Sequence, residues 1–159
     1  MIYKNTLLTK ELMRKEVIRI AHDAASKLEG RDLVIVGRTN RGVALGKEIA
    51  ALVRTLVSCP VPVFDYARMT DGYKGDLDAV VLLVEDVLAT GNSAKACVEV
   101  IRKSGVKSIH LATLICCGKT KPKVDVHYVG KKTVLEEGDV VKVFVKAVDG
   151  ADKVELYCI

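Results

Sequence analysis

One stretch of the sequence, residues 80–94, constrains the fold more than any other. An apolar run of strand length, residues 80–84, is followed directly by two acids, Glu85 and Asp86, and then by a short polar loop that leads into a helical pattern. A run this apolar predicts a buried strand rather than one at the edge of a sheet. The two carboxylates are then expected at the carboxyl end of that strand, beside the start of a helix.

This arrangement suits a sugar phosphate. Backbone N–H groups at the start of a helix attract a phosphate group, and carboxylates accept hydrogen bonds from ribose hydroxyls or hold Mg²⁺. Thr90 and Ser93 offer hydroxyls in the same loop, and Gly91 lets the backbone approach an anion closely. Two acids at a strand end also occur in α/β proteins without a ligand, but the buried strand before them and the helix start after them favour binding.

A second loop, residues 37–42, also follows an apolar run and precedes a helical pattern. Its sequence, GRTNRG, has the glycine spacing of a P-loop, but Val43 and Ala44 stand where that motif needs Lys and Ser or Thr. The P-loop interpretation therefore fails. An ordinary turn between strand and helix is one alternative. Because two such loops in one small sheet converge on one crevice, we favour a diphosphate-binding role for its two arginines.

The hydrophobic pattern predicts a single α/β domain over residues 1–159. Helices are expected where apolar residues recur at helical spacing, with Thr9 as the N-cap of the first, over residues 9–28, 41–54 and 93–103. Strands are expected over residues 33–36, 61–64, 80–84 and 108–116, a loop over 69–78, and further strands over 124–129, 140–145 and 154–157. Strands that alternate with helices and end in a β tail predict a parallel sheet with a small added β element.

Composition limits the classes of function. A chain of 159 residues with 50% hydrophobic and 28% charged residues is typical of one globular domain. The apolar run at residues 79–84 is too short to cross a bilayer, and charged residues interrupt the N-terminal segment, so we expect a cytoplasmic protein with no membrane partner. The net charge of +5 is compatible with RNA or with a phosphorylated substrate.

Cysteine, histidine and lysine carry little chemistry by themselves. The five cysteines lack a C-x-x-C spacing, so we expect reduced thiols. The three histidines form no catalytic or metal-binding spacing, and we assign them no role. A lysine cluster is expected to be a solvated face, with an RNA or phosphate surface as the alternative; it consists of Lys119, Lys121, Lys123, Lys131 and Lys132.

Residues 81–93, VLLVEDVLATGNS, are similar to the phosphoribosyl-pyrophosphate motif of type I phosphoribosyltransferases. Within that superfamily the chain resembles the bifunctional pyrimidine-operon regulator/uracil phosphoribosyltransferase family. The matching pieces are residues 19–22, 36–43, 128–131 and 148–152. The resemblance implies the type I fold, which is a central parallel sheet flanked by helices with a small β-rich hood.

The resemblance also implies an activity and its site. The donor is Mg²⁺-phosphoribosyl pyrophosphate, from which ribose 5-phosphate passes to a nucleobase with loss of pyrophosphate. The 5′-phosphate is expected on Ala89, Thr90, Gly91, Asn92 and Ser93, and the pyrophosphate near Arg38, Thr39, Asn40 and Arg41. Glu85, Asp86 and Arg41 are the expected catalytic residues. Glu85 and Asp86 are also expected to hold Mg²⁺, directly or through water or the ribose.

Three further residues, Asp125, Tyr128 and Val129, are expected in the base pocket. A carboxylate accepts hydrogen bonds, so Asp125 favours a base that presents N–H donors, and we expect uracil to be a poor substrate.

The alternative function is a nucleotide-sensing, RNA-binding regulator of pyrimidine genes with little or no turnover. Its basis is His22 together with Arg14, Lys15 and Arg19 on the first helix, and the lysine cluster. We expect a homo-oligomer, a dimer or larger.

Overall fold

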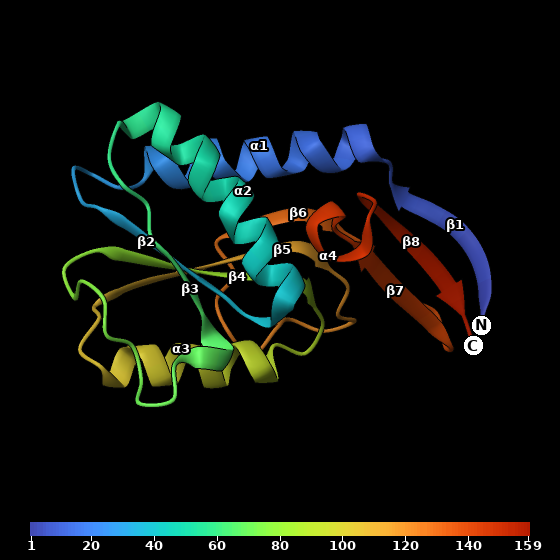
Figure 1. Cartoon of the computed structure of the whole chain (residues 1–159). Helices are drawn as coiled ribbons and strands as arrows, with labels where there is room; N and C mark the ends of the chain where they lie inside the picture. Colours follow the sequence, from blue (N-terminus) through green and yellow to red (C-terminus); the bar gives the residue numbers. More distant parts are fainter.

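A five-stranded parallel sheet lies at the centre of the molecule (Figure 1). The computed structural model describes residues 1–159, and the strand order is β3-β2-β4-β5-β6. The strands are β2 (Leu33–Gly37), β3 (Val63–Asp65), β4 (Val80–Leu88), β5 (Ser108–Cys116) and β6 (Tyr128–Lys132). Residues 80–85 of the middle strand, β4, are all buried, which explains the continuous apolar run in the sequence. The predicted parallel α/β sheet is confirmed.

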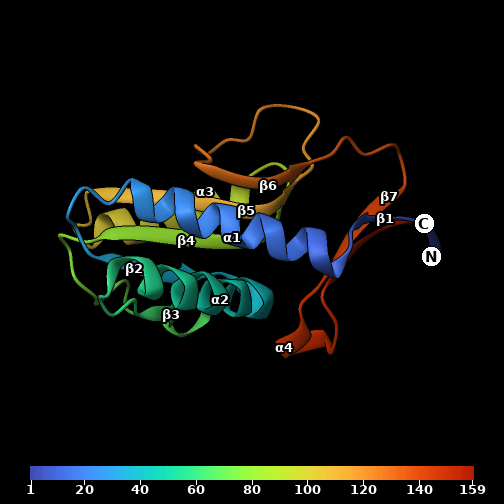
Figure 2. The ribbon, with the colours of Figure 1, turned by 90° about the horizontal axis from the view of Figure 1, so that it is seen from above.

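Helices cover both faces of this sheet. α1 (Lys10–Ser26) and α2 (Thr39–Val57) lie on one face and α3 (Asn92–Lys103) on the other (Figures 1 and 2). Because successive side chains of a strand point to opposite faces, β4 contributes to both core layers. Leu82 and Val84 belong to the layer with α1 and α2, and Leu83 to the layer with α3.

A separate three-stranded antiparallel sheet holds both chain ends (Figure 1). We call it, with the short helix α4 (Lys146–Asp149), the hood. Its strands lie in the order β1-β8-β7 and are β1 (Ile2–Leu8), β7 (Asp139–Phe144) and β8 (Lys153–Cys158). The two C-terminal strands were predicted as residues 140–145 and 154–157. The sequence did not predict β1 or α4, since β1 becomes a strand by pairing with β8 at the other end of the chain.

The strand before the two acids is longer than predicted. β4 continues to Leu88 because β5 pairs with it as far as Leu88 and Cys116. Glu85 and Asp86 therefore lie inside the strand, and not after its end as expected. The loop that follows is correspondingly short, and α3 begins at Asn92.

Other helices and strands also begin or end at residues that differ from the predicted ones. The strand predicted over residues 124–129 is wrong for its first four residues, because the parallel pairing of β5 with β6 begins at Ala112 and Tyr128. α2 spans Thr39–Val57 where 41–54 was predicted. The predicted cap is confirmed, since the hydroxyl of Thr9 accepts a hydrogen bond from the Leu12 amide. Residues 69–78 form a loop as predicted, after a single 3-10 turn, η1 (Tyr66–Arg68).

All five cysteines are free thiols. None of the helices combines the length and the apolar character that crossing a membrane requires.

Candidate functional site

The loop between β4 and α3 encloses a hollow of about 190 Å³, which we call the loop cavity. Most of the residues that line it come from the end of β4, the connecting loop and the start of α3. Arg38, which precedes α2, lines it as well. The full set is Arg38, Glu85 and residues 87–94. The fold thus brings together the predicted phosphate loop, one predicted acid and one arginine of the predicted pyrophosphate loop.

The start of α3 presents free backbone donors to the loop cavity. Gly91 is the N-cap, with φ of 83°, and no side chain caps the helix. The first amides of a helix have no intrahelical acceptor. Those of Ser93 and Ala94 belong to residues that line the cavity, whereas the Asn92 amide donates to the Thr90 hydroxyl at 3.4 Å. This geometry, with the positive end of the helix dipole, fits an anion.

Glu85 is the most buried acid of the site, with 1% of its surface exposed. Its Oε1 accepts a hydrogen bond from Nε of Arg38, while its Oε2 is buried and has no hydrogen-bond partner. Burial raises the pKa of Glu85, and the Arg38 guanidinium opposes that rise. The same hydrogen bond raises the pKa of Arg38. Arg38 therefore neutralises Glu85 on one side and leaves one carboxylate oxygen unsatisfied.

Asp86 is half-buried, and its Oδ1 accepts a hydrogen bond from the adjacent Val87 amide at 2.9 Å. No group of three or more His, Cys, Asp or Glu side chains is arranged to hold a metal ion. Mg²⁺ is commonly held by one or two carboxylates together with oxygens of a phosphorylated substrate. Glu85 lines the loop cavity with an unsatisfied oxygen, whereas Asp86 does not line it. The site therefore fits a mode in which one carboxylate acts together with substrate oxygens, and it does not fit an all-protein metal site.

The start of α2 is strained at Thr39, the first residue of the helix. This residue has φ of 65°, a left-handed conformation that threonine rarely adopts. Its hydroxyl accepts a hydrogen bond from the Gly42 amide at 3.3 Å, and the Arg38 amide donates to the Val84 carbonyl at 3.1 Å. The first bond closes the turn over residues 39–42, and the second ties Arg38 to β4. Thr39 and Asn40 are both exposed.

Arg41 does not line the loop cavity. Its guanidinium donates two hydrogen bonds to Asp149 of the hood, from Nε at 3.0 Å and from an Nη at 2.7 Å. Asp149 also accepts from the Val145 amide at 2.8 Å. The hydrogen bonds from Arg41 lower the pKa of Asp149, and the pairing raises the pKa of Arg41. Sequence reasoning missed Asp149, because 108 residues separate the partners and only the match at residues 148–152 pointed to it.

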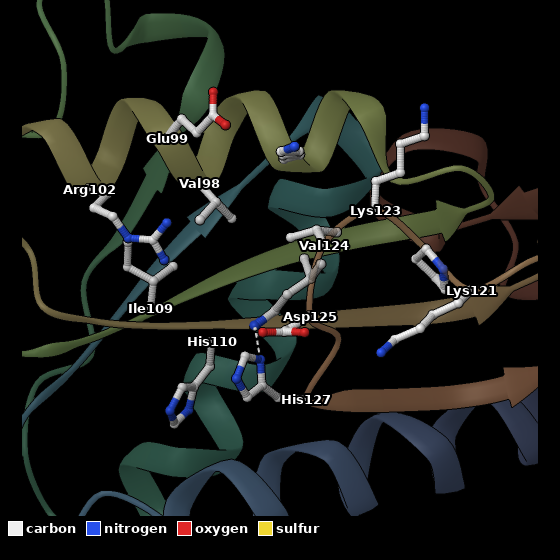
Figure 3. A pocket seen from close by; sticks show the side chains of 13 residues that line it. Val98, Glu99, Arg102, Ile109, His110, Lys121, Lys123, Val124, Asp125 and His127 are labelled. Carbon is white, nitrogen blue, oxygen red and sulfur yellow. Dashed lines mark hydrogen bonds between the residues drawn. The ribbon is translucent and has the colours of Figure 1, made fainter.

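The three residues expected in the base pocket do not meet at the loop cavity. Asp125 lines a different cavity beside α3 (Figure 3). Tyr128 is buried, with its hydroxyl 3.2 Å from Nδ1 of His110, and the Val129 carbonyl accepts a hydrogen bond from Arg19. The geometry therefore gives no support to the selection of a base by Asp125, and the base-pocket role of the three residues stays a prediction.

Two histidines to which no role was assigned lie together in the same cavity as Asp125. The rings of His110 and His127 stack with centroids 4.5 Å apart. Nothing in the sequence signals this pair, because it forms only when β5 and the segment before β6 come side by side.

The sequence matches the family described as "Phosphoribosyl transferase domain" over residues 4–149. The chain belongs to the phosphoribosyltransferase family. This phosphoribosyltransferase is 30% identical to the "Bifunctional protein PyrR" of Clostridium novyi, in an alignment that covers 99% of each chain. It is 31% identical to the "Bifunctional protein PyrR" of Thermus aquaticus, covering 99% of this chain and 97% of that protein.

Solved structures resemble this phosphoribosyltransferase in fold. A hypoxanthine phosphoribosyltransferase from Staphylococcus aureus superposes with a TM-score of 0.68 at 23% identity, covering 87% of this chain and 81% of that one. The hypoxanthine phosphoribosyltransferase from Trypanosoma cruzi, in complex with the product IMP, gives 0.67 at 16% identity, with 84% and 78% covered. The predicted family and the predicted fold, a parallel sheet flanked by helices with a small β-rich hood, are confirmed.

Proposed function

We propose that this phosphoribosyltransferase binds Mg²⁺-phosphoribosyl pyrophosphate in the loop cavity and transfers ribose 5-phosphate to a nucleobase. The observation that carries the proposal is the convergence, in one hollow, of free helix-start amides, a buried acid and Arg38. In the reaction, the bond from ribose C1 to a pyrophosphate oxygen breaks, a bond from a ring nitrogen of the base to C1 forms, and that nitrogen loses its proton.

The ribose 5-phosphate end belongs to the loop at the start of α3. We assign the 5′-phosphate to the backbone of residues 89–93, where Gly91 permits close approach and the amides of α3 lack internal acceptors. Glu85 is the acid that lines the loop cavity; Asp86 is less buried but does not line the cavity, and its contact with the ribose hydroxyls stays a prediction.

The pyrophosphate end belongs to the loop before α2. Arg38 lines the loop cavity, and its positive charge stabilises the negative charge that develops on the leaving pyrophosphate. Thr39 and Asn40 are exposed next to it. Arg41 is paired with Asp149 in the described conformation, so its proposed contact with pyrophosphate requires that pair to exchange partners.

Mg²⁺, when bound with the donor, would be held by Glu85 together with oxygens of the donor and would supply positive charge to the leaving group, and Asp86 is the predicted second carboxylate. The chain's own part is to orient the ribose through these acids. The unsatisfied Oε2 of Glu85 is an acceptor that would be available to a ribose hydroxyl.

Calorimetric titration with ribose 5-phosphate and with the Mg²⁺ donor tests the binding step. Gly91→Val should abolish binding, because an added Cβ lies 3.0 Å from the Val124 side chain and 3.3 Å from the Lys123 nitrogen, so the phosphate loop would have to move. Gly30→Val is a matched control: Gly30 has a similar φ of 81° and nothing within 4 Å of an added Cβ, and it does not line the loop cavity. Equal loss in both variants, or an anion bound elsewhere in a structure with ribose 5-phosphate, overturns the assignment.

A turnover assay with a panel of nucleobases tests the chemistry. Release of pyrophosphate that depends on one of the bases supports the proposal. If the donor binds and no base is converted, the transfer reaction is refuted and the regulator function takes its place.

The alternative function is a nucleotide-sensing regulator that binds RNA. One observation favours it: all five lysines of the predicted cluster are exposed, and none forms an ion pair. Arg19 contributes less than expected, since it pairs with Glu16 and donates to the carbonyls of Val129 and Gly130. A mobility-shift assay with RNA at increasing salt tests this function, because binding through phosphates weakens steeply as salt rises.

A further inference from the structure

A second hollow, of about 510 Å³, lies beside α3 on the side away from α1 and α2 (Figure 3). We call it the α3 cavity. Its walls are α3, the first half of β5 and residues 121–127, which connect β5 to β6. It shares no lining residue with the loop cavity. Its volume is within the range of small-molecule sites, which is about 300–1,000 Å³.

Four cationic side chains surround the α3 cavity: Lys95 and Arg102 from α3, and Lys121 and Lys123 from the connecting segment. None of the four forms an ion pair within the chain. The two acids that line the cavity, Glu99 and Asp125, leave an excess of positive charge. Figure 3 shows Arg102 and Lys121 on opposite sides of the cavity, with Glu99 directed away from the histidines. Unpaired like charges gathered around a hollow favour a multiply charged anion.

The floor and wall of the α3 cavity are not charged. His110 and His127 stack at the floor, and Val98, Ile109 and Val124 supply apolar surface. Desolvation lowers the pKa of both histidines, although Asp125 opposes the shift at His127, and this direction favours the neutral rings. Nδ1 of His127 accepts a hydrogen bond from the Leu111 amide at 3.0 Å, which leaves the ring proton on Nε2.

Asp125 lies beside His127 (Figure 3). It forms no ion pair. It gives the cavity one strong hydrogen-bond acceptor for N–H or O–H groups. Neutral aromatic rings, apolar side chains, an acceptor carboxylate and a cationic rim together match a ligand with a planar polar ring and several phosphate charges.

We propose that the α3 cavity is a second binding site, separate from the loop cavity, for a nucleoside di- or triphosphate. The phosphates lie among Lys95, Arg102 and Lys121, and the base lies against the stacked histidines and Val124, with its N–H groups toward Asp125. The concave shape favours a small nucleotide over an RNA strand, whose phosphates follow an extended surface.

The α3 cavity also contacts the predicted phosphate loop. The Lys123 amide donates to the Thr90 carbonyl at 2.9 Å, and a Cβ on Gly91 would lie 3.0 Å from the Val124 side chain. A ligand that orders residues 121–124 thus acts directly on the backbone of the phosphate loop. This coupling, unlike the binding site itself, rests on the function proposed above.

The test is calorimetric titration of the full chain with each of the four ribonucleoside triphosphates and with inorganic tripolyphosphate, in the presence of saturating ribose 5-phosphate. The expected result is binding of at least one triphosphate, more tightly than tripolyphosphate. The Arg102→Ala/Lys121→Ala double variant should weaken it about tenfold or more, because each removed side chain makes a charge-assisted contact. Lys103→Ala/Lys107→Ala is the matched control, since it removes two exposed cations near α3 that do not line the cavity; it should change affinity less than about twofold.

Equal weakening in the two double variants overturns the proposal, as does triphosphate binding that ribose 5-phosphate abolishes, because the loop cavity is then the only site. Binding of RNA, weakened by Arg102→Ala/Lys121→Ala, without any binding of triphosphates shows an RNA surface and also overturns it. The proposed transferase function is tested separately, because the turnover assay with nucleobases contains no triphosphate.

Discussion

The ion pair between Arg41 and Asp149 links the predicted pyrophosphate loop to the hood, and its strength is measurable. We predict that a double-mutant cycle with Arg41→Gln and Asp149→Asn gives a coupling free energy of about 1.5 kcal/mol in favour of the native pair. The asparagine keeps an acceptor for the Val145 amide, so that the cycle isolates the contact with Arg41.

The magnitude follows from the geometry. Two hydrogen bonds join the guanidinium to the carboxylate, at 3.0 and 2.7 Å, and hydrogen bonds to charged groups contribute roughly 1.5–3 kcal/mol when sheltered from water. The Asp149 side chain is 14% exposed, but that of Arg41 is 40% exposed, so solvent screening reduces the upper figure. Exposed pairs are worth about 0.2–1 kcal/mol, and this pair should exceed them.

The assay is urea unfolding of the four proteins of the cycle, followed by circular dichroism at several pH values. Because Arg41 lowers the pKa of Asp149 in the folded state, the pair stabilises the protein fully above the ordinary carboxyl pKa of about 3.9. The stabilisation is lost as the pH falls through the lowered pKa of the folded state. The difference between wild type and Asp149→Asn should therefore be constant near neutral pH and shrink in acid.

Arg68 and Asp65 provide the comparison. They approach only to 4.0 Å, and the Arg68 side chain is 89% exposed, so Arg68→Gln should cost less than about 0.5 kcal/mol. A coupling between Arg41 and Asp149 no larger than this cost, or one that persists unchanged in acid, would refute the reasoning.

Three other predictions concern the loops and the core. Asp86→Asn should weaken binding of the Mg²⁺ donor, as measured by calorimetry, more than Asp78→Asn, and equal effects would remove Asp86 from the site. Gly42→Ala should lower the melting temperature by several degrees in a thermal scan, because its Cβ would lie 2.6 Å from the Val84 carbonyl oxygen and α2 would have to move off β4; an unchanged melting temperature contradicts this. Burial raises the pKa of Tyr73 to about 12, so Tyr73→Phe and wild type should give the same ultraviolet titration of tyrosine up to about pH 11, and a difference below that pH would show a less buried ring.

Local signals in the sequence predicted the central architecture well. The apolar run that became β4 predicts a buried strand because its residues are apolar on both faces, which only a covered parallel sheet accommodates. Thr9 predicts the start of α1 because a cap acts over three residues. The motif at residues 81–93 predicted the family for the same reason, since its strand, loop and helix start are contiguous in the chain.

Contacts between distant residues decided what the sequence did not predict. Residues 2–8 are exposed along most of their length and show no strand pattern, and they become β1 only through the ladder with β8. The extension of β4 past Glu85 depends in the same way on pairing with β5. A strand's limits are set by its neighbour, and the sequence of one strand does not contain that information.

For the candidate site too, the sequence predicted some properties and the tertiary structure decided others. The chemistry of its groups, namely the acids, the arginines and the glycine at the helix start, can be seen in the sequence, because it depends on residue type and on spacing of a few residues. Whether these groups are free to bind a ligand depends on the tertiary structure. The fold pairs Arg38 with Glu85, ties Arg41 to Asp149 and moves Asp125 to the α3 cavity. Each of these outcomes follows from which segments lie side by side in the fold, and only the packing of distant segments determines that.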